Sequence, residues 1–478
     1  MFDVESLTLF GLIALLLHAL GVLTALHAIT RSKTSQGAIA WAIMLVMFPY
    51  VTLPMYWIFG RNKFQGYVRA RRSDDKGIRH VLERLQEYRS VFRGTLADDH
   101  CGLRVLERLA KMPFTRHNRV GLLIDGEATF SAIFAAVDAA TDYIVVQYFI
   151  VKDDQVGRQL HEKLIAKAKD GVRVYFLYDE VGCYKLSKAY LGEMTDAGIA
   201  VRPFQTTKGW GNRFQLNFRN HRKIVIVDGR TAFVGGLNVG DEYMGRDPKI
   251  GPWRDTHTEL AGPVVQCVQL AFLEDWYWAT HEVPELNWDP EAADGGEQEV
   301  LALASGPADP FETCGLFFVH AIHSARHRVW IASPYFVPDA QVIAALQLAA
   351  LRGVDVRVML PEKPDHVLVY LSAFSFIEET EAAGVKIYRY QPGFLHQKVI
   401  LVDDEFAAVG TANLDNRSFR LNFEITIAAA DARFAAEVRA MLEEDFAACR
   451  LVKSEDLTGR SFWFRLAVSV SRLMAPIQ

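Results

Sequence analysis

A short motif that occurs twice constrains this chain more than any other feature. The pattern His-x-Lys-x-x-x-x-Asp reads HRKIVIVD at residues 221–228 and HQKVILVD at residues 396–403. Its two histidines are 175 residues apart. Such a repeat indicates two related halves that each carry one copy. An imidazole and an ammonium group suit attack on a phosphodiester, because one bonds to phosphorus or exchanges protons while the other neutralises oxygen charge.

The repeat extends to the segments around the motif. Apolar runs alternate with helical patterns in the same order in both halves, which is typical of an α/β fold. The runs IVIV and VILV are apolar at consecutive positions, as in strands buried on both faces. The paired segments are DYIVVQYF (142–149) with HRVWIASPYF (327–336), GVRVYFLYDE (171–180) with GVDVRVMLPE (353–362), and AGIAVRPF (197–204) with AGVKIYRY (383–390). The sequence therefore predicts two homologous α/β halves packed face to face about a pseudo-two-fold axis.

Changes in composition divide the chain into segments. An acidic stretch rich in Pro and Gly separates the halves and is expected to be a linker. The helix-patterned residues before the first half are expected to form a connector. The expected segments are a hydrophobic hairpin (1–62), a helical connector (63–115), a first half (116–283), the linker (284–299), a second half (300–450) and an amphipathic tail (451–478).

The first 60 residues are unusually apolar. Residues 7–30 contain no Lys, Arg, Asp or Glu, and neither do residues 38–60. Each run is longer than the roughly 20 residues that a helix needs to cross a bilayer. We therefore expect a membrane hairpin with spans of about 7–30 and 38–60. Pro49 and Pro54 could kink or break the second span, so a re-entrant segment remains an alternative. His18 and His27, inside the first span, are expected to face the partner helix or the membrane interface.

Basic residues near the ends of the spans indicate the topology. None precedes the first span, whereas five follow the second: Arg61, Lys63, Arg69, Arg71 and Arg72. The positive-inside rule then places the large C-terminal part in the cytoplasm. Arg31 and Lys33 in the hairpin loop oppose this assignment.

Charge and cysteine content exclude several classes of function. The net charge of −5 argues against a nucleic-acid binder that relies on overall positive charge. The five cysteines are scattered without a Cys-x-x-Cys pair, which predicts free thiols. His281-Glu282 lacks the second histidine of a zinc-protease motif. We expect no metal ion and no other cofactor.

Residue spacing assigns roles within each motif. Residues i and i+2 of a strand share a face, so each histidine and its lysine should point the same way. The aspartates lie seven residues after their histidines, on the opposite parity and next to a turn, which favours a structural role and leaves a catalytic one open. An asparagine follows each histidine by 17 residues, where its amide could donate to a phosphate oxygen. The candidates are His221, Lys223, Asp228 and Asn238 in the first half, and His396, Lys398, Asp403 and Asn413 in the second.

These residues together resemble the phospholipase D superfamily, which carries two such motifs in duplicated α/β halves. The resemblance covers about residues 115–450. It implies that one histidine attacks phosphorus to form a phosphohistidine, while the other protonates the leaving alcohol and deprotonates the incoming one. The lysines and asparagines would hold the phosphate. The resemblance favours His221 as the nucleophile.

The same resemblance implies a carboxylate that orients each histidine. Glu424 matches this position in the second half, and Asp255 is the better match in the first. The superfamily commonly has a hydroxyl two residues before each asparagine. Here that position is Thr411 in one half but Gly236 in the other, so one hydroxyl contact must be lost or replaced.

Within the superfamily, nearly the whole chain resembles the bacterial cardiolipin synthases. The resemblance rests on the hairpin ending in FGRNK and on the segments RNHRKIVIVDGRTAFVGGLNVGDEY and GFLHQKVILVDDEFAAVGTANLDNRSF. It implies a multi-pass protein of the bacterial inner membrane that transfers a phosphatidyl group between two phosphatidylglycerol molecules and releases glycerol. One phosphodiester replaces another, so no energy-supplying cofactor is required.

Two further segments suit a lipid substrate. Residues 206–221 interleave aromatic and basic side chains, which suits anionic headgroups but also single-stranded nucleic acid. The tail SFWFRLAVSVSRLMAPI could lie on a membrane or pack on the protein. The alternatives are a hydrolase of the same fold, acting on lipid or nucleic acid, and a scaffold without catalysis. Phosphatidylglycerol, cardiolipin and the bilayer are the expected partners and nucleic acid is not; the sequence does not indicate the oligomeric state.

Overall fold

The computed structural model describes residues 4–32, 34–60, 64, 67, 91–96, 101–205 and 217–478. The chain forms two compact units, one of residues 1–69 with 206–218 and one of residues 70–205 with 219–478. Most of the predicted connector lies outside the described residues. So does most of the aromatic and basic segment before His221, including Lys208, Trp210 and Phe214.

The N-terminal unit is a helical hairpin. Its first helix, α1 (Val4–Arg31), packs against α2 (Ser35–Met47) and α3 (Pro49–Phe59). Thr34 caps α2, because its hydroxyl accepts a hydrogen bond from the Gly37 amide at 3.2 Å. Within the described residues, one helix is long and apolar enough to cross a bilayer, over Leu9–Arg31.

The second apolar run is divided at Phe48. This residue adopts φ −133° and ψ 56°, outside the helical region, because the ring of Pro49 disfavours a helical conformation in the residue before it. Pro49 then begins α3, where its missing amide hydrogen has no helical acceptor to lose. The expectation that the first-span histidines face the partner helices is confirmed, because Nδ1 of His27 lies 2.8 Å from the Tyr56 hydroxyl and Nδ1 of His18 lies 3.4 Å from that of Tyr50.

The first half begins with a long strand that leads into strands and helices in alternation. Its elements are β1 (Thr115–Ile124), α8 (Asp125–Ala139), β2 (Tyr143–Tyr148), α9 (Gln155–Lys169), β3 (Arg173–Asp179), α10 (Lys188–Asp196), β4 (Ala200–Phe204), β5 (Arg219–Asn220), β6 (Ile224–Val227), β7 (Thr231–Gly235), the 3-10 helix Asp241–Met244, β8 (Trp253–Arg254), β9 (Thr256–Ala261) and α11 (Val264–Thr280). A further helix, α7 (Cys101–Ala110), precedes it.

The second half repeats this order. Its elements are β10 (Gln298–Ser305), α12 (Thr313–Ser324), β11 (Arg328–Ala332), β12 (Phe336–Val337), α13 (Ala340–Leu351), β13 (Asp355–Pro361), α14 (Val367–Phe374), α15 (Ile377–Glu381), β14 (Lys386–Tyr390), β15 (Phe394–Leu395), β16 (Val399–Val402), β17 (Phe406–Gly410), β18 (Leu414–Asp415), α16 (Asn416–Arg420), β19 (Asn422–Ala430), α17 (Ala432–Ala447) and β20 (Cys449–Leu451). Beyond it lie α18 (Glu455–Thr458) and α19 (Phe462–Arg472).

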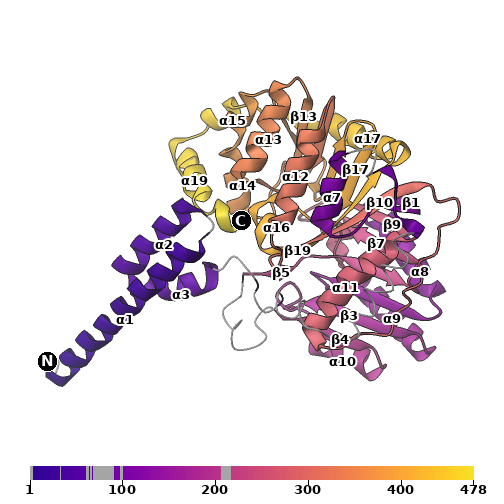
Figure 1. Cartoon of the computed structure of the whole chain (residues 1–478), viewed down its shortest axis with the longest axis horizontal. Helices are drawn as coiled ribbons and strands as arrows, with labels where there is room; N and C mark the ends of the chain where they lie inside the picture. The colour runs from indigo at the N-terminus through magenta and orange to yellow at the C-terminus, as the bar shows by residue number, and fades with distance from the viewer. Residues whose placement is uncertain are drawn as a thin grey trace. The chain divides into compact units, whose positions relative to one another are not determined.

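One sheet runs through both halves. The strand order is β20-β14-β13-β11-β16-β17-β19-β10-β1-β9-β7-β6-β2-β3-β4, so the halves meet where β1 pairs with β10. On either side of that pair the order is mirrored, because β1 pairs with β9 as β10 pairs with β19. Figure 1 shows the magenta first half and the orange to yellow second half on the two sides of this junction. The predicted duplicated α/β fold is confirmed, but the expected face-to-face packing is wrong, because the pairing of β1 with β10 joins the halves edge to edge in one sheet.

The pairing of β2 with β6 and of β11 with β16 shows how the two repeats align. Gln147 pairs with Ile224 in the first half, and Ala332 pairs with Val399 in the second. The repeated strands therefore correspond, but the Tyr-Phe pairs that end the two sequence runs do not occupy equivalent positions. Two extra residues in the second half precede its tyrosine.

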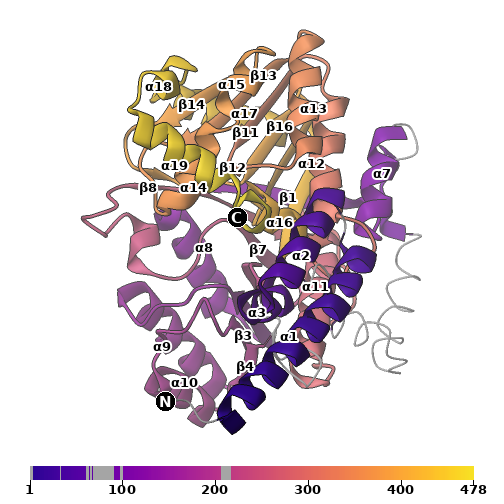
Figure 2. The same ribbon diagram turned by 90° about the vertical axis from the view of Figure 1, so that its left-hand side faces the viewer.

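Helices cover both faces of the sheet and enclose two hydrophobic cores. In the first half α11 packs on one face of the sheet. Helix α8 contacts β1 and β9, and α9 contacts β3. In the second half α12 and α13 form one layer of helices. Helix α17 contacts β16 and β17. Each half has its own cluster of buried aliphatic and aromatic side chains, as expected for a duplicated domain. Figure 2 shows the helices of both halves around the shared sheet.

Candidate active site

Each His-x-Lys motif begins where a short strand crosses to the opposite half. Strand β5, just before His221, pairs in parallel with β19 of the second half. Strand β15, just before His396, pairs in parallel with β8 of the first half. The amide of His221 donates to the Phe423 carbonyl at 2.9 Å, and that of His396 donates to the Arg254 carbonyl at 2.8 Å. The backbone of each histidine therefore lies beside the residue before the carboxylate of the other half. That residue is Phe423 before Glu424 for His221, and Arg254 before Asp255 for His396.

This crossing pairs each histidine with the carboxylate of the opposite half. Nδ1 of His221 lies 2.9 Å and 3.1 Å from the two oxygens of Glu424. Nδ1 of His396 lies 2.7 Å from Oδ2 of Asp255. A carboxylate accepts hydrogen bonds, so Nδ1 carries the proton and Nε2 is left with a lone pair. The sequence singled out both carboxylates, whereas the crossed pairing becomes visible only in the fold.

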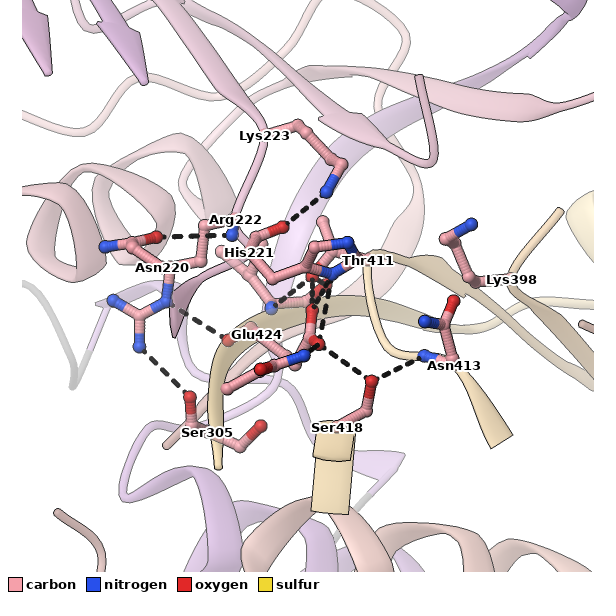
Figure 3. Close-up of polar contacts among 12 residues, drawn as sticks. Asn220, His221, Arg222, Lys223, Ser305, Lys398, Thr411, Asn413, Ser418 and Glu424 are labelled. Carbon is pink, nitrogen blue, oxygen red and sulfur yellow. Dashed lines mark hydrogen bonds and ion pairs between the residues drawn. The ribbon is translucent and has the colours of Figure 1, made fainter. Parts of the chain in front are cut away.

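Glu424 is held by donors from its own half (Figure 3). The Thr411 hydroxyl donates to it at 2.6 Å and the Ser418 hydroxyl at 2.8 Å. The amide of Asn422 adds a bond at 3.1 Å. Glu424 is fully buried, so these bonds compensate for the lost hydration of its charge. Thr411 thus contacts the carboxylate that orients the histidine, and Ser418 and Asn422 are site residues that sequence reasoning missed.

Asp255 is supported in another way. The Thr256 amide donates to its Oδ1 at 2.8 Å, and the Trp253 indole donates to Oδ2 at 3.3 Å. A Cβ atom at Gly236 would lie only 1.9 Å from Asp255 Oδ1. The glycine that stands where the second half has Thr411 is therefore required by space, and a backbone amide and an indole replace the missing hydroxyl.

The motif lysines extend beside their histidines. Residues 221–223 and 396–398 lie between paired strands rather than within one, because the strands before and after them pair with different partners. The expected strand parity is therefore wrong, yet each lysine still turns back toward its histidine. Nζ of Lys223 donates to the His221 carbonyl at 2.7 Å, and Nζ of Lys398 donates to the His396 carbonyl. Each ammonium keeps two further hydrogens to donate.

The two asparagines differ in their contacts. Oδ1 of Asn238 accepts a bond from the Ile150 amide at 3.2 Å, and its Nδ2 donates to the Tyr243 hydroxyl at 3.1 Å. Nδ2 of Asn413 donates to Asp415 at 3.3 Å, whereas its buried Oδ1 has no hydrogen-bond partner among the described residues. Both side chains retain hydrogen-bonding capacity, which a substrate could use.

The motif aspartates lie away from the histidines, at the far ends of β6 and β16. Asp228 accepts hydrogen bonds from the amides of residues 141–143 at 2.8–2.9 Å. Asp403 accepts bonds from the amides of residues 326–328 at 2.7–2.9 Å. Both residues adopt positive φ, 53° and 52°, which aspartate tolerates better than most residues. The structure does not bring these two carboxylates to the histidines.

A buried arginine, which sequence reasoning missed, ties the halves together beside His221. Arg222 donates to Asp275 at 2.9 Å in its own half and to the backbone carbonyls of Glu424 at 3.1 Å and Ser305 at 3.3 Å in the other. The equivalent residue after His396 is uncharged. There Gln397 donates to Asp445 at 3.1 Å, and Arg254 of the first half bonds to the same carboxylate at 2.8 Å.

Burial dominates the electrostatics of the site. His221 and His396 are each 8% exposed. Burial lowers the pKa of His221 to about 4, opposed by Glu424, and holds the pKa of His396 well below 6.5. Burial also lowers the pKa of Lys223 to about 7 and that of Lys398 to about 8. Both imidazoles are therefore neutral at pH 7 before substrate arrives.

The pKa values of the two carboxylates, Glu424 and Asp255, shift in opposite directions. Burial acts to raise the pKa of Glu424, but His221, Lys223 and the Thr411 hydroxyl outweigh it and leave that pKa below 4.5. Burial raises the pKa of Asp255 above 3.8, despite Lys398 and the Thr256 amide.

Among the described residues, no group of three or more His, Cys, Asp or Glu side chains could hold a metal ion.

Comparisons with known proteins identify the family. The model described as "Cardiolipin synthase, PLD-like domain" matches residues 133–249 and 318–446, one segment in each half. The model described as "Phospholipase_D-nuclease N-terminal" matches residues 19–61 of the hairpin. Both matches coincide with the repeat and the apolar segment expected from the sequence.

Relatives match over the full chain. The chain is 51% identical to cardiolipin synthase A of Pseudomonas entomophila, over 99% of this chain and 100% of the relative. It is 50% identical to cardiolipin synthase A of Pseudomonas putida over 99% of both chains. The crystal structure of phosphatidylserine synthase from Haemophilus influenzae has the same fold, with a TM-score of 0.61 and 14% identity over 79% of this chain and 100% of that one. This chain belongs to the bacterial cardiolipin synthase family of the phospholipase D superfamily.

Proposed function

We propose that this membrane-associated chain makes cardiolipin by transferring the phosphatidyl group of one phosphatidylglycerol molecule to another, with release of glycerol. The observation that carries the proposal is the pair of crossed histidine–carboxylate contacts within one buried site. Its full-length similarity to cardiolipin synthases indicates which phosphodiester is the substrate.

In the first step Nε2 of His221 attacks phosphorus, and the bond between phosphorus and the glycerol headgroup oxygen breaks. His396 gives its Nε2 proton to that oxygen, so glycerol leaves as a neutral alcohol. In the second step a headgroup hydroxyl of another phosphatidylglycerol gives its proton to His396 and attacks phosphorus. The phosphorus–nitrogen bond breaks, and His221 returns to its starting state.

Binding of the substrate favours the uptake, from solvent, of the proton that this scheme needs. Two lysines and two carboxylates share the site with two histidines whose pKa values lie below 6.5. A phosphodiester adds one negative charge to this buried set, which favours protonation of one imidazole. His396 then carries the proton as the first step begins, while His221 stays neutral and nucleophilic.

The different carboxylates favour His221 as the nucleophile. A histidine that bonds to phosphorus acquires positive charge, and a fixed anion at Nδ1 stabilises it. Glu424 accepts three hydrogen bonds besides that of His221, and its pKa lies below its ordinary value. Asp255, whose pKa is raised, suits a histidine that alternately gains and loses a proton.

The remaining site residues support the phosphate or the scaffold. Lys223 and Lys398 would donate to its nonbridging oxygens, together with the amides of Asn238 and Asn413. Thr411 would act through Glu424. Asp228 and Asp403 would fix the turns after β6 and β16 through backbone hydrogen bonds, without touching substrate.

The test follows lipid products by mass spectrometry. The full chain in phosphatidylglycerol vesicles should yield cardiolipin and glycerol in equal amounts. Phosphatidic acid without cardiolipin would show a hydrolase instead. The variants His221→Ala and His396→Ala should lose the reaction, while His327→Ala, at an exposed histidine, should retain it.

We also propose that both apolar runs are anchored in the inner membrane and that the catalytic unit faces the cytoplasm. The basic residues that follow residue 60 support this orientation. Labelling of a cysteine substituted for the exposed Leu351 with a membrane-impermeant maleimide tests it, in a background whose other reactive cysteines are replaced. Cells should be labelled after the inner membrane is opened and not before; labelling of intact spheroplasts would reverse the orientation.

A further inference from the structure

The C-terminal helix α19 exposes an apolar face. Its Phe464 ring contacts Phe374 of α14 with centroids 5.5 Å apart, and Val468 and Ser471 are buried. The helix is therefore docked on the catalytic unit by one side. On the other side Trp463 is 74% exposed and Leu473, just after the helix, is 77% exposed.

The exposed apolar residues share one arc of the helix. At about 100° per residue, residues 462, 463, 466, 470, 473 and 474 fall within an arc of roughly 120°. All six are large and apolar, namely Phe462, Trp463, Leu466, Val470, Leu473 and Met474. The arginines lie outside this arc, with Arg465 and Arg472 between the apolar and the buried sides. The helix thus has a docked face, a basic face and an exposed apolar face.

Helix α14 continues the same surface. Val367 and Leu368, at its start, are exposed, and Figure 2 shows α14 and α19 side by side. We call the eight exposed apolar residues of α14 and α19 the apolar patch. It comprises Val367, Leu368, Phe462, Trp463, Leu466, Val470, Leu473 and Met474.

A cleft lies between α14 and the ends of β12, β13 and β14. Its lining includes Tyr370 of α14 together with Tyr335, Asp365 and Arg389. The Tyr335 hydroxyl donates to Asp365 at 2.6 Å. Arg389 is buried, and its Nη2 has no hydrogen-bond partner among the described residues. Phe336, which also lines the cleft, pairs with Leu414 directly after Asn413, so the cleft lies beside the candidate site.

We propose that the apolar patch lies on the surface of a bilayer that contains anionic phosphatidylglycerol, and that it holds the cleft beside α14 against the lipid headgroups. The chemistry of the surface fits this occupant. An exposed tryptophan and large aliphatic side chains insert at the headgroup boundary, while flanking arginines face anionic phosphates. Arg460, Arg465 and Arg472 are all exposed and supply that charge. The inference rests on the proposed function only for the identity of the lipid.

Fluorescence quenching tests the contact directly. The full chain, with its reactive native cysteines replaced, carries an environment-sensitive label on a cysteine substituted for Trp463 and is reconstituted in vesicles with nitroxide-bearing lipids. Strong quenching is expected at this position. The matched control is a label at Leu351, which is 72% exposed on α13 but lies outside the patch, and it should be quenched little. Equal quenching at both positions, or none at 463, would overturn the proposal.

Activity on two forms of substrate provides the second test. The double variant Trp463→Glu/Leu473→Glu should slow transfer on vesicle phosphatidylglycerol by about tenfold, because two charges oppose insertion. It should match the wild type on short-chain phosphatidylglycerol dissolved as monomers. Leu351→Glu should change neither rate. Equal losses on both substrates, or no loss on vesicles, would contradict a membrane-docking role.

A change of oligomeric state would also overturn the proposal. If the patch instead covers a second copy of the chain, the double variant should dissociate a dimer in detergent, which native mass measurement would detect. The surface and the function fail separately. Quenching at position 463 in a chain that makes no cardiolipin would leave the surface standing and remove the proposed reaction.

Discussion

The two histidine–carboxylate pairs reach the same geometry by different means. His221 meets a glutamate that hydroxyl and amide side chains hold in place, whereas His396 meets an aspartate held by a backbone amide and an indole. Glutamate is longer by one methylene, and the half with the shorter aspartate has Gly236 where the other has Thr411. The backbone at Gly236 therefore comes close to the shorter Asp255 side chain. In both halves a carboxylate oxygen contacts Nδ1 of the histidine, although the residue types around that carboxylate differ.

The largest expected effect comes from removing each histidine, and it should separate their roles. His221→Ala should lower kcat by at least about 10⁴-fold with any leaving group, because the nucleophile is lost. His396→Ala should lower it by about 10²–10⁴-fold with phosphatidylglycerol. With a p-nitrophenyl ester, whose leaving group needs no proton, formation of the phosphohistidine should largely recover in His396→Ala alone. Recovery in His221→Ala instead would exchange the two assignments.

Gly236→Ala tests whether space sets the difference between the pairs. Its Cβ atom would collide with Asp255 and displace His396, for which we expect a loss of about 10²-fold in kcat. Gly192→Ala in α10 is the matched control, since nothing lies within 4 Å of its added methyl group. Steady-state rates with phosphatidylglycerol measure both. An active Gly236→Ala enzyme would show that Asp255 can be oriented without this close approach.

The two lysines should give the halves different pH responses. A protonated lysine holds the phosphate, so activity should fall as the pH rises through its pKa, by about tenfold per unit well above it. For kcat/KM the free enzyme must also gain the His396 proton, so the profile should already fall with pH below 7 and should become steeper near pH 7 for Lys223 and near pH 8 for Lys398. The bound phosphodiester favours the charged lysines, so the decline in kcat should start at a higher pH. A kcat/KM profile flat from pH 6 to 10 would contradict the role of both ammonium groups.

A smaller effect is expected from the hydroxyl that only one half possesses. Thr411→Ala removes one of the donors to Glu424 and should lower kcat by about tenfold, or ~1.4 kcal/mol. Thr411→Ser keeps the hydroxyl and should restore most of the rate. Rescue by serine distinguishes the hydrogen bond from the packing of the methyl group. Equal losses in the two variants would assign the effect to packing.

The smallest effect on rate is expected at the motif aspartates. Asp228→Asn and Asp403→Asn should each change kcat by less than about threefold, because their carboxylates bond to backbone amides away from the histidines. Each should instead lower the melting temperature, since hydrogen bonds to charged groups contribute ~1.5–3 kcal/mol. Thermal unfolding in detergent measures the loss. A large drop in kcat with unchanged melting would return these residues to the catalytic set.

The sequence predicted much of this architecture because the repeat is present in the residues themselves. Strand runs such as IVIV and the equal spacing from His221 to Asn238 and from His396 to Asn413 were enough to predict duplicated α/β halves. The turn that follows each motif, at Asp228 and at Asp403, agrees with the position of these aspartates away from the histidines. These predictions depend on local periodicity, which a sequence contains.

Other features depend on contacts between distant segments. Nothing near His221 indicates that β5 pairs with β19, so the partner carboxylate could not be assigned from spacing. The requirement for Gly236 appears only when Asp255 is placed beside it. Arg222 reads as an ordinary basic residue next to a motif, although it bridges the two halves. Because β5 pairs with β19 whereas β6 pairs with β7, His221 and Lys223 lie outside a regular strand.

The crossed contacts also set when activity can appear during synthesis. A chain made from its N-terminus carries a membrane anchor and His221 long before Glu424 has been translated. Until β19, which contains Glu424, joins the sheet, the proposed nucleophile His221 has no anion at Nδ1, and Arg222 lacks the Glu424 carbonyl to which it donates across the halves. Under the proposed mechanism the growing polypeptide therefore lies beside the lipids of the cell without attacking them, and it becomes reactive only when β19 is in place.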